Sequence, residues 1–147
     1  MDQQTEIQVR EATAGDADAL AALCGQLGYA VSAAETRKRL ANETGRADRT
    51  VTVACESGRV VGWLAVQVQS TIESGSWAEI TGLVVDQSAR RAGVGAALVQ
   101  WAREWAKARG QDRLRVRSNV IRPEAPPFYQ SQGFTQTKQQ RIFDAPL

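Results

Sequence analysis

Residues 83–96 have the sequence LVVDQSARRAGVGA, and this stretch decides how the rest of the chain is interpreted. Leu83, Val84 and Val85 are apolar on both faces, which is typical of a central strand. The stretch then leads through Gly93 and Gly95 into a segment with helical spacing of apolar residues. The first amides of a helix lack intrahelical partners and lie at the positive end of the helix dipole, so they attract anions. The pattern predicts a buried strand, a glycine-containing loop and a long helix in succession, with the first helix amides as a candidate phosphate site.

Other phosphate-binding motifs fit this loop less well. The dinucleotide fingerprint needs a third Gly or Ala where the chain has Leu98, and the P-loop needs Gly-Lys followed by Ser or Thr. Gly93 and Gly95 let a ligand approach the backbone closely, and Arg90 or Arg91 can add a charge-assisted contact. Two glycines before a helix also serve turn geometry alone, so the loop by itself leaves both interpretations open.

The segments before the loop alternate between helical and strand patterns. Thr13 with Asp16, and Ser32 with Glu35, are arranged as helix N-caps, and Gly28 and Gly45 end the two helices that follow. β-branched residues and period-two alternation predict strands, and Ser57-Gly58 predicts a hairpin turn. We therefore expect two helices within residues 13–45, and strands at residues 7–11, 50–56, 60–72 and 77–85.

The segments after the loop continue this alternation. A helix is expected over residues 93–108 and a half-buried strand over residues 113–117. The prolines that follow allow a helix start only around Phe128, and residues 134–143 are expected to close the fold as a strand. The predicted order is βααβββαβαβ, an α/β (α+β) fold, and the whole chain of residues 1–147 is predicted to be a single domain.

Composition excludes several classes of function. The chain has 18 Lys+Arg against 16 Asp+Glu and no histidine, which removes imidazole metal sites and His-activated nucleophiles. The net charge of +2 is too weak to indicate nucleic acid binding. Cys24 and Cys55 are isolated and predicted to be small buried residues. No segment is long enough to span a membrane, and Asp2 and Glu6 do not suit a secretory signal, so we expect a cytoplasmic protein.

Two motifs together resemble those of the GNAT superfamily of N-acetyltransferases. Val85, Asp86 and residues 90–96 are similar to the acetyl-CoA motif of that superfamily, and Ala125, Phe128, Tyr129 and Gly133-Phe134 are similar to its later motif. With the element order, the resemblance covers residues 9–143. It implies the GNAT acyl-CoA N-acyltransferase fold, with a mixed central sheet whose parallel strands, ending at Val85 and Ser118, splay apart.

The resemblance also implies acetyl-CoA as cosubstrate and no metal. Backbone groups of Leu83, Val84 and Val85 would pair with the pantetheine arm. Arg90 and the amides of the following loop would hold the pyrophosphate, and Asn119 or Arg122 would lie beside the cofactor. The loop residues concerned are Arg91, Ala92, Gly93, Val94, Gly95 and Ala96.

Acyl transfer to an amine needs a base, an oxyanion donor and an acid. Glu79 is the first candidate base, with Glu73 in reserve, although Glu79 could also simply face solvent from its strand. The backbone N–H of Val84 or Val85 would stabilise the oxyanion. Tyr129 would protonate the departing thiolate, although it could also only pack its short helix. Because neither cysteine lies in a matched motif, we expect direct transfer in a ternary complex.

The acceptor is expected to be a primary amine on a small molecule or peptide, with no nucleic acid or membrane partner. Arg113, Arg115 and Arg117 are predicted to form a solvated stripe on one strand face. Trp77 could line the acceptor pocket or be an ordinary strand tryptophan. Two other functions stay open: a non-catalytic acyl-CoA-binding regulatory module, and a degenerate scaffold forming a homodimer through its last strand.

Overall fold

The computed structural model describes residues 6–90, 92–118 and 123–147 of the chain. These residues divide into two compact units, Met1–Arg117 and Ser118–Leu147. The single domain expected from the chain length stays a prediction.

The first unit is built on a sheet of five strands, which lie side by side in chain order in the described residues. The first four are antiparallel, and the last pair, β4 with β5, is parallel. This arrangement confirms the predicted mixed sheet. The strands are β1 (Ile7–Glu11), β2 (Arg49–Glu56), β3 (Arg59–Thr71), β4 (Gly75–Val85) and β5 (Leu114–Val116).

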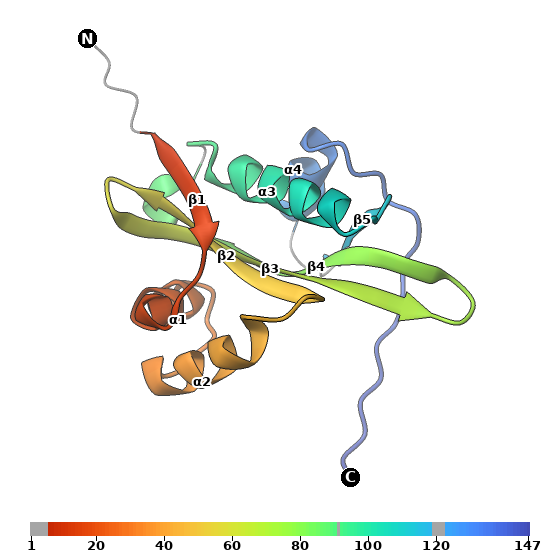
Figure 1. Cartoon of the computed structure of the whole chain (residues 1–147), viewed down its shortest axis with the longest axis horizontal. Coiled ribbons are helices and arrows are strands. Elements are labelled where there is room, and N and C mark those ends of the chain that lie inside the picture. Colours follow the sequence, from red (N-terminus) through yellow and green to blue (C-terminus); the bar gives the residue numbers. More distant parts are fainter. Residues whose placement is uncertain (1–5, 91, 119–122) are drawn as a thin grey trace. The chain divides into compact units, whose positions relative to one another are not determined.

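Three helices cover the two faces of this sheet. Figure 1 shows α1 (Ala17–Gln26) and α2 (Ala33–Glu43) on one face and α3 (Val94–Ala108) on the other. We call the face under α1 and α2 the first face. The predicted N-caps are present: the Ser32 hydroxyl accepts a hydrogen bond from the Glu35 N–H at 3.0 Å, and the Asp16 carboxylate accepts one from the Thr13 N–H at 2.8 Å. The order of elements up to β5 is therefore confirmed.

An ion pair between the exposed Arg10 and the buried Asp16 connects β1 to the start of α1. Both guanidinium nitrogens of Arg10 donate to the Asp16 carboxylate at 2.8 Å. The Arg10 contact is the main reason why the pKa of Asp16 is lowered from its ordinary value. Because the same carboxylate also caps Thr13, it holds the turn after β1 in the geometry that directs α1 onto the first face.

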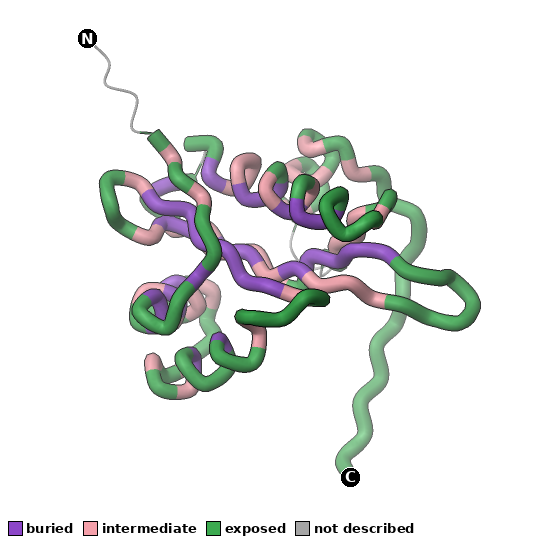
Figure 2. Tube along the Cα trace, viewed as in Figure 1, coloured by how far each residue is buried: buried purple, intermediate pink, exposed green. Residues whose placement is uncertain are grey.

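Apolar side chains fill both sides of the sheet. Figure 2 shows buried residues concentrated on the central strands and on the side of α3 that faces them. The first-face cluster comprises Ala12, Leu20, Leu40, Val51, Val53 and Cys55, with Val60, Trp63 and Ala65 packed against it. On the opposite side α3 buries Val94, Leu98, Val99, Ala102, Trp105 and Ala106. The apolar residues whose helical spacing predicted α3 thus form the buried face of that helix.

A bulge interrupts β4 in its middle. Ala65 of β3 pairs with Gly82 whereas Val66 pairs with Ile80, so Thr81 is an extra residue in β4. The parallel pairing of β4 with β5 also ends at this point, at Ile80 opposite Val116. Beyond the bulge, residues 81–85 pair with β3 along one edge. Within the described residues no strand pairs with their other edge, which we call the open edge of β4.

The second unit contains the helix α4 (Ala125–Ser131). Proline is tolerated in the first turn of a helix, and with Pro126 and Pro127 there α4 begins slightly earlier than the predicted start around Phe128. Gly133 has φ 89° and ends the helix, and the Phe134 N–H donates to the Tyr129 carbonyl at 3.0 Å. The predicted short helix ending in Gly-Phe is confirmed.

The strand predicted at residues 134–143 is wrong. This segment forms no strand, and Ile142 and Phe143 are 83% and 86% exposed. Residues 135–141 have the sequence TQTKQQR, which offers no apolar face to bury, so the alternation that indicates a half-buried strand is missing. Among the described residues, no helix is both long and apolar enough to cross a membrane.

Candidate active site

The open edge of β4 presents the backbone groups of Leu83 and Val85. The Asp86 N–H donates to the Val61 carbonyl of β3 at 2.8 Å. Backbone groups of successive strand residues point to alternate edges, so Val84 also points toward β3 while Leu83 and Val85 point away from it. All three residues were predicted to contact the cofactor. The structure makes the backbone of Leu83 and Val85 available on the open edge and favours Val85 over Val84 as an amide donor.

Gly82 lets an aromatic ring lie against this part of β4. A Cβ atom placed on Gly82 would meet the Trp63 ring at 2.6 Å, well inside contact distance. Trp63 belongs to the cluster on the first face, so the ring joins β3, β4 and the core under α1 and α2. This part of β4 is thereby held in place by packing on the first face as well as by its pairing with β3.

The N-terminus of α3 lies a few residues beyond this edge along the chain. Its N-cap is Gly93, with φ 84° and ψ 9°, a left-handed conformation that glycine adopts without strain, and no side chain of the described residues caps the helix. The Ala97 N–H makes the first intrahelical bond, to the Gly93 carbonyl at 3.0 Å. The amides of Val94, Gly95 and Ala96 therefore have no intrahelical partner and can bind an anion.

The side chains around this N-terminus leave it accessible. Arg90, Ala92 and Gly93 are exposed, and Gly95 and Ala96 are half-buried. Val94 is buried and anchors the first turn to the sheet. The predicted contributions of Arg91, Asn119 and Arg122 lie outside the described residues.

Glu79 is buried on the first face of the sheet. It pairs with Gln67 of β3, which lies on the same face as Trp63 because residues two apart share a face. Its Oε1 accepts a hydrogen bond from Trp77 Nε1 at 3.1 Å, and its Oε2 lies 3.3 Å from Arg117 Nε. Only 7% of the residue is exposed, so the alternative that Glu79 simply faces solvent is wrong.

The reserve base candidate has a different environment. Glu73 is exposed in the turn between β3 and β4. Among the described residues, Glu73 has no buried partner of the kind that orients Glu79. Of the two carboxylates, Glu79 is the one whose orientation is fixed by neighbouring side chains.

Arginines in β5 and directly beside it gather around the same residues. In the parallel ladder Glu79 is the register partner of Arg115. The guanidinium carbons of Arg113 and Arg115 lie 5.1 Å and 4.7 Å from the centre of the Trp77 ring. The predicted stripe on one strand face is thus present, but its members contact Trp77 and Glu79 instead of forming an independent solvated row.

This grouping of side chains from β4 and from the segment around β5 was not predicted from the sequence. The period-two spacing of Trp77 with Glu79, and of Arg113 with Arg115 and Arg117, was visible in the sequence. A parallel pairing of the two strands would have brought the stripes together, but the register between them is set by the tertiary structure.

Tyr129 lies in the second unit, within an aromatic cluster. Its ring packs edge to face with Phe128 and Phe134, with centroid distances of 5.1 Å and 5.7 Å. Burial raises the pKa of Tyr129 above its ordinary value near 10. The phenol therefore keeps its proton at neutral pH, as a proton donor must, and it also packs its helix, so both predicted interpretations of this residue are compatible with its surroundings.

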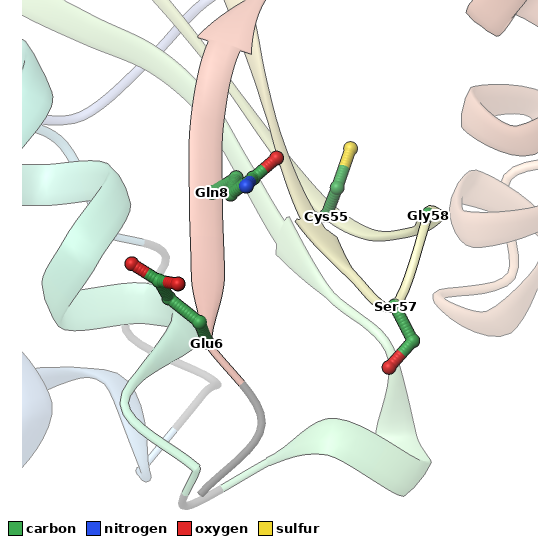
Figure 3. Close-up of a pocket in the computed structure, with 5 residues that line it drawn as sticks. All are labelled: Glu6, Gln8, Cys55, Ser57 and Gly58. Atoms are coloured by element: carbon green, nitrogen blue, oxygen red, sulfur yellow. The ribbon is translucent and has the colours of Figure 1, made fainter.

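A shallow pocket lies at another part of the first unit. Figure 3 shows its lining residues, and its volume is about 230 Å³. None of the predicted site residues lines it. The lining residues are Glu6, Gln8, Cys55, Ser57 and Gly58.

The cysteines and acidic residues of the described chain form no metal centre. Cys24 and Cys55 are both free thiols, and Cys55 is buried, as predicted, whereas Cys24 is partly exposed. In the part of the chain that the structure describes, no group of three or more His, Cys, Asp or Glu side chains is arranged to hold a metal ion.

Comparisons with known proteins agree with this geometry. The chain is 29% identical to an aminoglycoside N(6')-acetyltransferase type 1 of Klebsiella aerogenes, over 77% of this chain and 76% of that one. It is 31% identical to an aminoalkylphosphonate N-acetyltransferase of Salmonella typhimurium over 86 residues, which are 58% of this chain and 56% of the relative.

A solved structure has the same fold. It is an aminoglycoside N-acetyltransferase in complex with CoA, 14% identical to this chain, and it aligns with a TM-score of 0.89 over 100% of this chain and 99% of that one. In addition, residues 18–134 match the sequence model of the acetyltransferase (GNAT) family. With the open edge of β4 and the uncapped N-terminus of α3, these matches show that the chain belongs to the GNAT family of acetyltransferases.

Proposed function

We propose that this protein transfers the acetyl group of acetyl-CoA to a primary amine of a small molecule, by direct attack in a ternary complex. The observation that carries the proposal is the continuity of β4 and α3: an unpaired strand edge leads through residues 86–93 to helix amides without partners. The two relatives support a small-molecule acceptor, because their names describe acetylation of aminoglycosides and of aminoalkylphosphonates. The solved relative in complex with CoA supports the acyl donor.

The residues on the open edge fit a cosubstrate that has an amide-containing arm and a diphosphate. Backbone groups of Leu83 and Val85 can hydrogen-bond the arm as an added strand would. The amides of residues 93–96 and the guanidinium of Arg90 can hold the diphosphate. Acetyl-CoA, when bound, supplies the activated thioester carbonyl.

Glu79 is proposed as the base that prepares the amine. An alkyl amine with a pKa near 10.4 arrives charged at neutral pH, so a proton must leave before attack. The carboxylate of Glu79 can accept that proton directly or through water, and Trp77 and Arg117 hold it in one orientation. We propose that the acceptor binds on the first face, because the Glu79 side chain lies on that face.

The remaining charges develop on the thioester oxygen and sulfur. We propose that the Val85 N–H donates to the oxyanion, because it points to the open edge and is fixed by the strand. Tyr129 would then return a proton to the thiolate of the leaving group. Its raised pKa ensures that the proton is present on the phenol at neutral pH.

Thiol release from acetyl-CoA with a panel of amines tests the proposed activity. We expect turnover with at least one primary amine, and an increase in melting temperature with CoA; at 100 times its Kd, a ligand adds about 2.7 kcal/mol to stability. Stabilisation without turnover would instead support the regulatory module. If neither turnover nor stabilisation is seen, the degenerate scaffold is the interpretation that remains.

Replacing Gly93 tests the diphosphate site. Gly93→Ala forces a side chain into the left-handed region, at a cost of about 1–2 kcal/mol, and shifts the first amides of α3. We expect the Kd for CoA, measured by calorimetry, to rise about 5- to 10-fold. Gly110→Ala is a matched control, because Gly110 has φ 74° and follows the other end of the same helix. Equal effects of the two changes on CoA binding would refute the assignment.

Replacing Glu79 tests the base. Glu79→Gln retains an acceptor for the Trp77 N–H but cannot take up a proton, so we expect kcat to fall about 10- to 100-fold at pH 7. The loss should shrink as the pH approaches the pKa of the amine, because free amine then becomes abundant. Glu73→Gln is the control and should leave the pH profile of kcat unchanged. A Glu79→Gln profile parallel to that of the wild type would remove Glu79 as the base.

Replacing Tyr129 tests the acid. Tyr129→Phe keeps the aromatic packing with Phe128 and Phe134 and removes only the hydroxyl. We expect kcat to drop about 10- to 100-fold while the Kd for CoA changes little. Phe134→Leu, which disturbs the same cluster but no proton donor, controls for packing. Wild-type turnover by Tyr129→Phe would show that the residue has only a structural role.

A further inference from the structure

The first face of β4 and β5 carries more positive charge than its carboxylate can neutralise. Arg115 of β5 and the flanking Arg113 contact Trp77, and the flanking Arg117 contacts Glu79. Glu79 is ion-paired with Arg117. Within residues 6–90 and 92–117, no carboxylate lies within ion-pair distance of Arg113 or Arg115.

The contact with Trp77 holds the guanidinium groups of Arg113 and Arg115 without occupying their N–H donors. Both lie against the ring, at 5.1 Å and 4.7 Å from its centre. A guanidinium stacked on an aromatic face keeps its N–H donors directed outward at its edge. The Trp77 indole is buried, so it forms a fixed support for both arginines. The pair is therefore preorganised to bind a planar or tetrahedral oxyanion.

The position of the pair relative to Glu79 relates it to catalysis. Arg115 is the register partner of Glu79, and neighbouring strands are about 4.8 Å apart. An anion held by Arg115 would lie within a few bonds of an amine whose proton passes to Glu79. Figure 1 shows that the hairpin of β3 and β4 extends beyond the part of the sheet that α1 and α2 cover.

We propose that Arg113 and Arg115, supported by Trp77, form an anion-binding subsite for the acceptor. The preferred acceptor then carries a carboxylate, phosphate or phosphonate group a few bonds from its primary amine. The inference rests on the proposed acetyltransferase function and narrows its substrate class. A polycationic acceptor would place further positive charge against two arginines, whereas an anionic one neutralises them.

The test compares three acceptors that share an aminoethyl group: 2-aminoethylphosphonate, 2-aminoethanol and 1,2-diaminoethane. For each, kcat/KM is measured for the wild type and for Arg113→Gln/Arg115→Gln. Each acceptor is compared with itself across the two proteins, because the amines differ in pKa. We expect the variant to lose about 10- to 100-fold with the phosphonate, about 3-fold or less with 2-aminoethanol, and to gain with 1,2-diaminoethane.

Arg37→Gln/Arg39→Gln is the matched control. These arginines are exposed on α2, and their replacement removes the same two charges from the net charge of the chain. The control should lose less than about 2-fold with any acceptor. Equal losses in the two double variants, or equal losses for the phosphonate and for 2-aminoethanol, would overturn the subsite.

Binding without turnover separates this inference from the proposed function. Calorimetry should show 2-aminoethylphosphonate binding to the wild type and to the α2 variant, and much weaker binding to Arg113→Gln/Arg115→Gln. If that pattern appears but no amine is ever acetylated, the acetyltransferase proposal fails and the subsite stands. If amines are acetylated but the phosphonate binds all three proteins alike, or binds none, the subsite is refuted.

Should Arg113→Gln/Arg115→Gln fail to fold, the wild-type protein provides the decisive measurement. The side-chain Nε–H signals of Arg113 and Arg115 should shift in NMR spectra on titration with 2-aminoethylphosphonate and not with 2-aminoethanol. Signals that do not respond to the phosphonate would refute the proposal.

Discussion

The pairing of β4 with β5 ends at Ile80, and the candidate site depends on this. Thr81 is the extra residue of a bulge at the same point, and beyond it β3 is the one strand of the described residues that pairs with β4. Unpaired strand edges usually attract another strand, so an edge kept open inside a sheet needs other support. Here the Trp63 ring against Gly82 supplies packing on the first face. The backbone of Leu83 and Val85 is thereby kept accessible for hydrogen bonding by a ligand.

The alternation of side chains along β4 separates the two substrates of the proposed reaction. Glu79 and Trp77 point to the first face, whereas α3 covers the opposite one. A diphosphate on the amides of α3 and an amine beside Glu79 would then approach the open edge from different sides. This geometry suits direct transfer in a ternary complex, since neither substrate must leave before the other binds.

Charge around the proposed base comes from the neighbouring strand. Arg117 orients the Glu79 carboxylate, while Arg113 and Arg115 lie on the Trp77 ring beside it. Backbone groups hold the proposed cofactor and side chains of β5 surround the proposed acceptor. Substitutions in and next to that short strand are therefore expected to change the acceptor without altering the cofactor site.

The sequence alone determined the elements of the first unit, the short helix of the second and the glycine-containing loop that is the proposed cofactor site. N-caps, glycine positions and residue alternation act over a few residues, so the caps at Asp16 and Ser32 and the uncapped start of α3 could be predicted. Only the tertiary structure decided which side chains meet across strands: the parallel register that places Arg115 beside Glu79, the burial of Glu79 and the outward direction of the Val85 amide. It also showed that residues 134–143 form no strand. These features depend on contacts between segments far apart in the chain, whose register and partners no local pattern specifies.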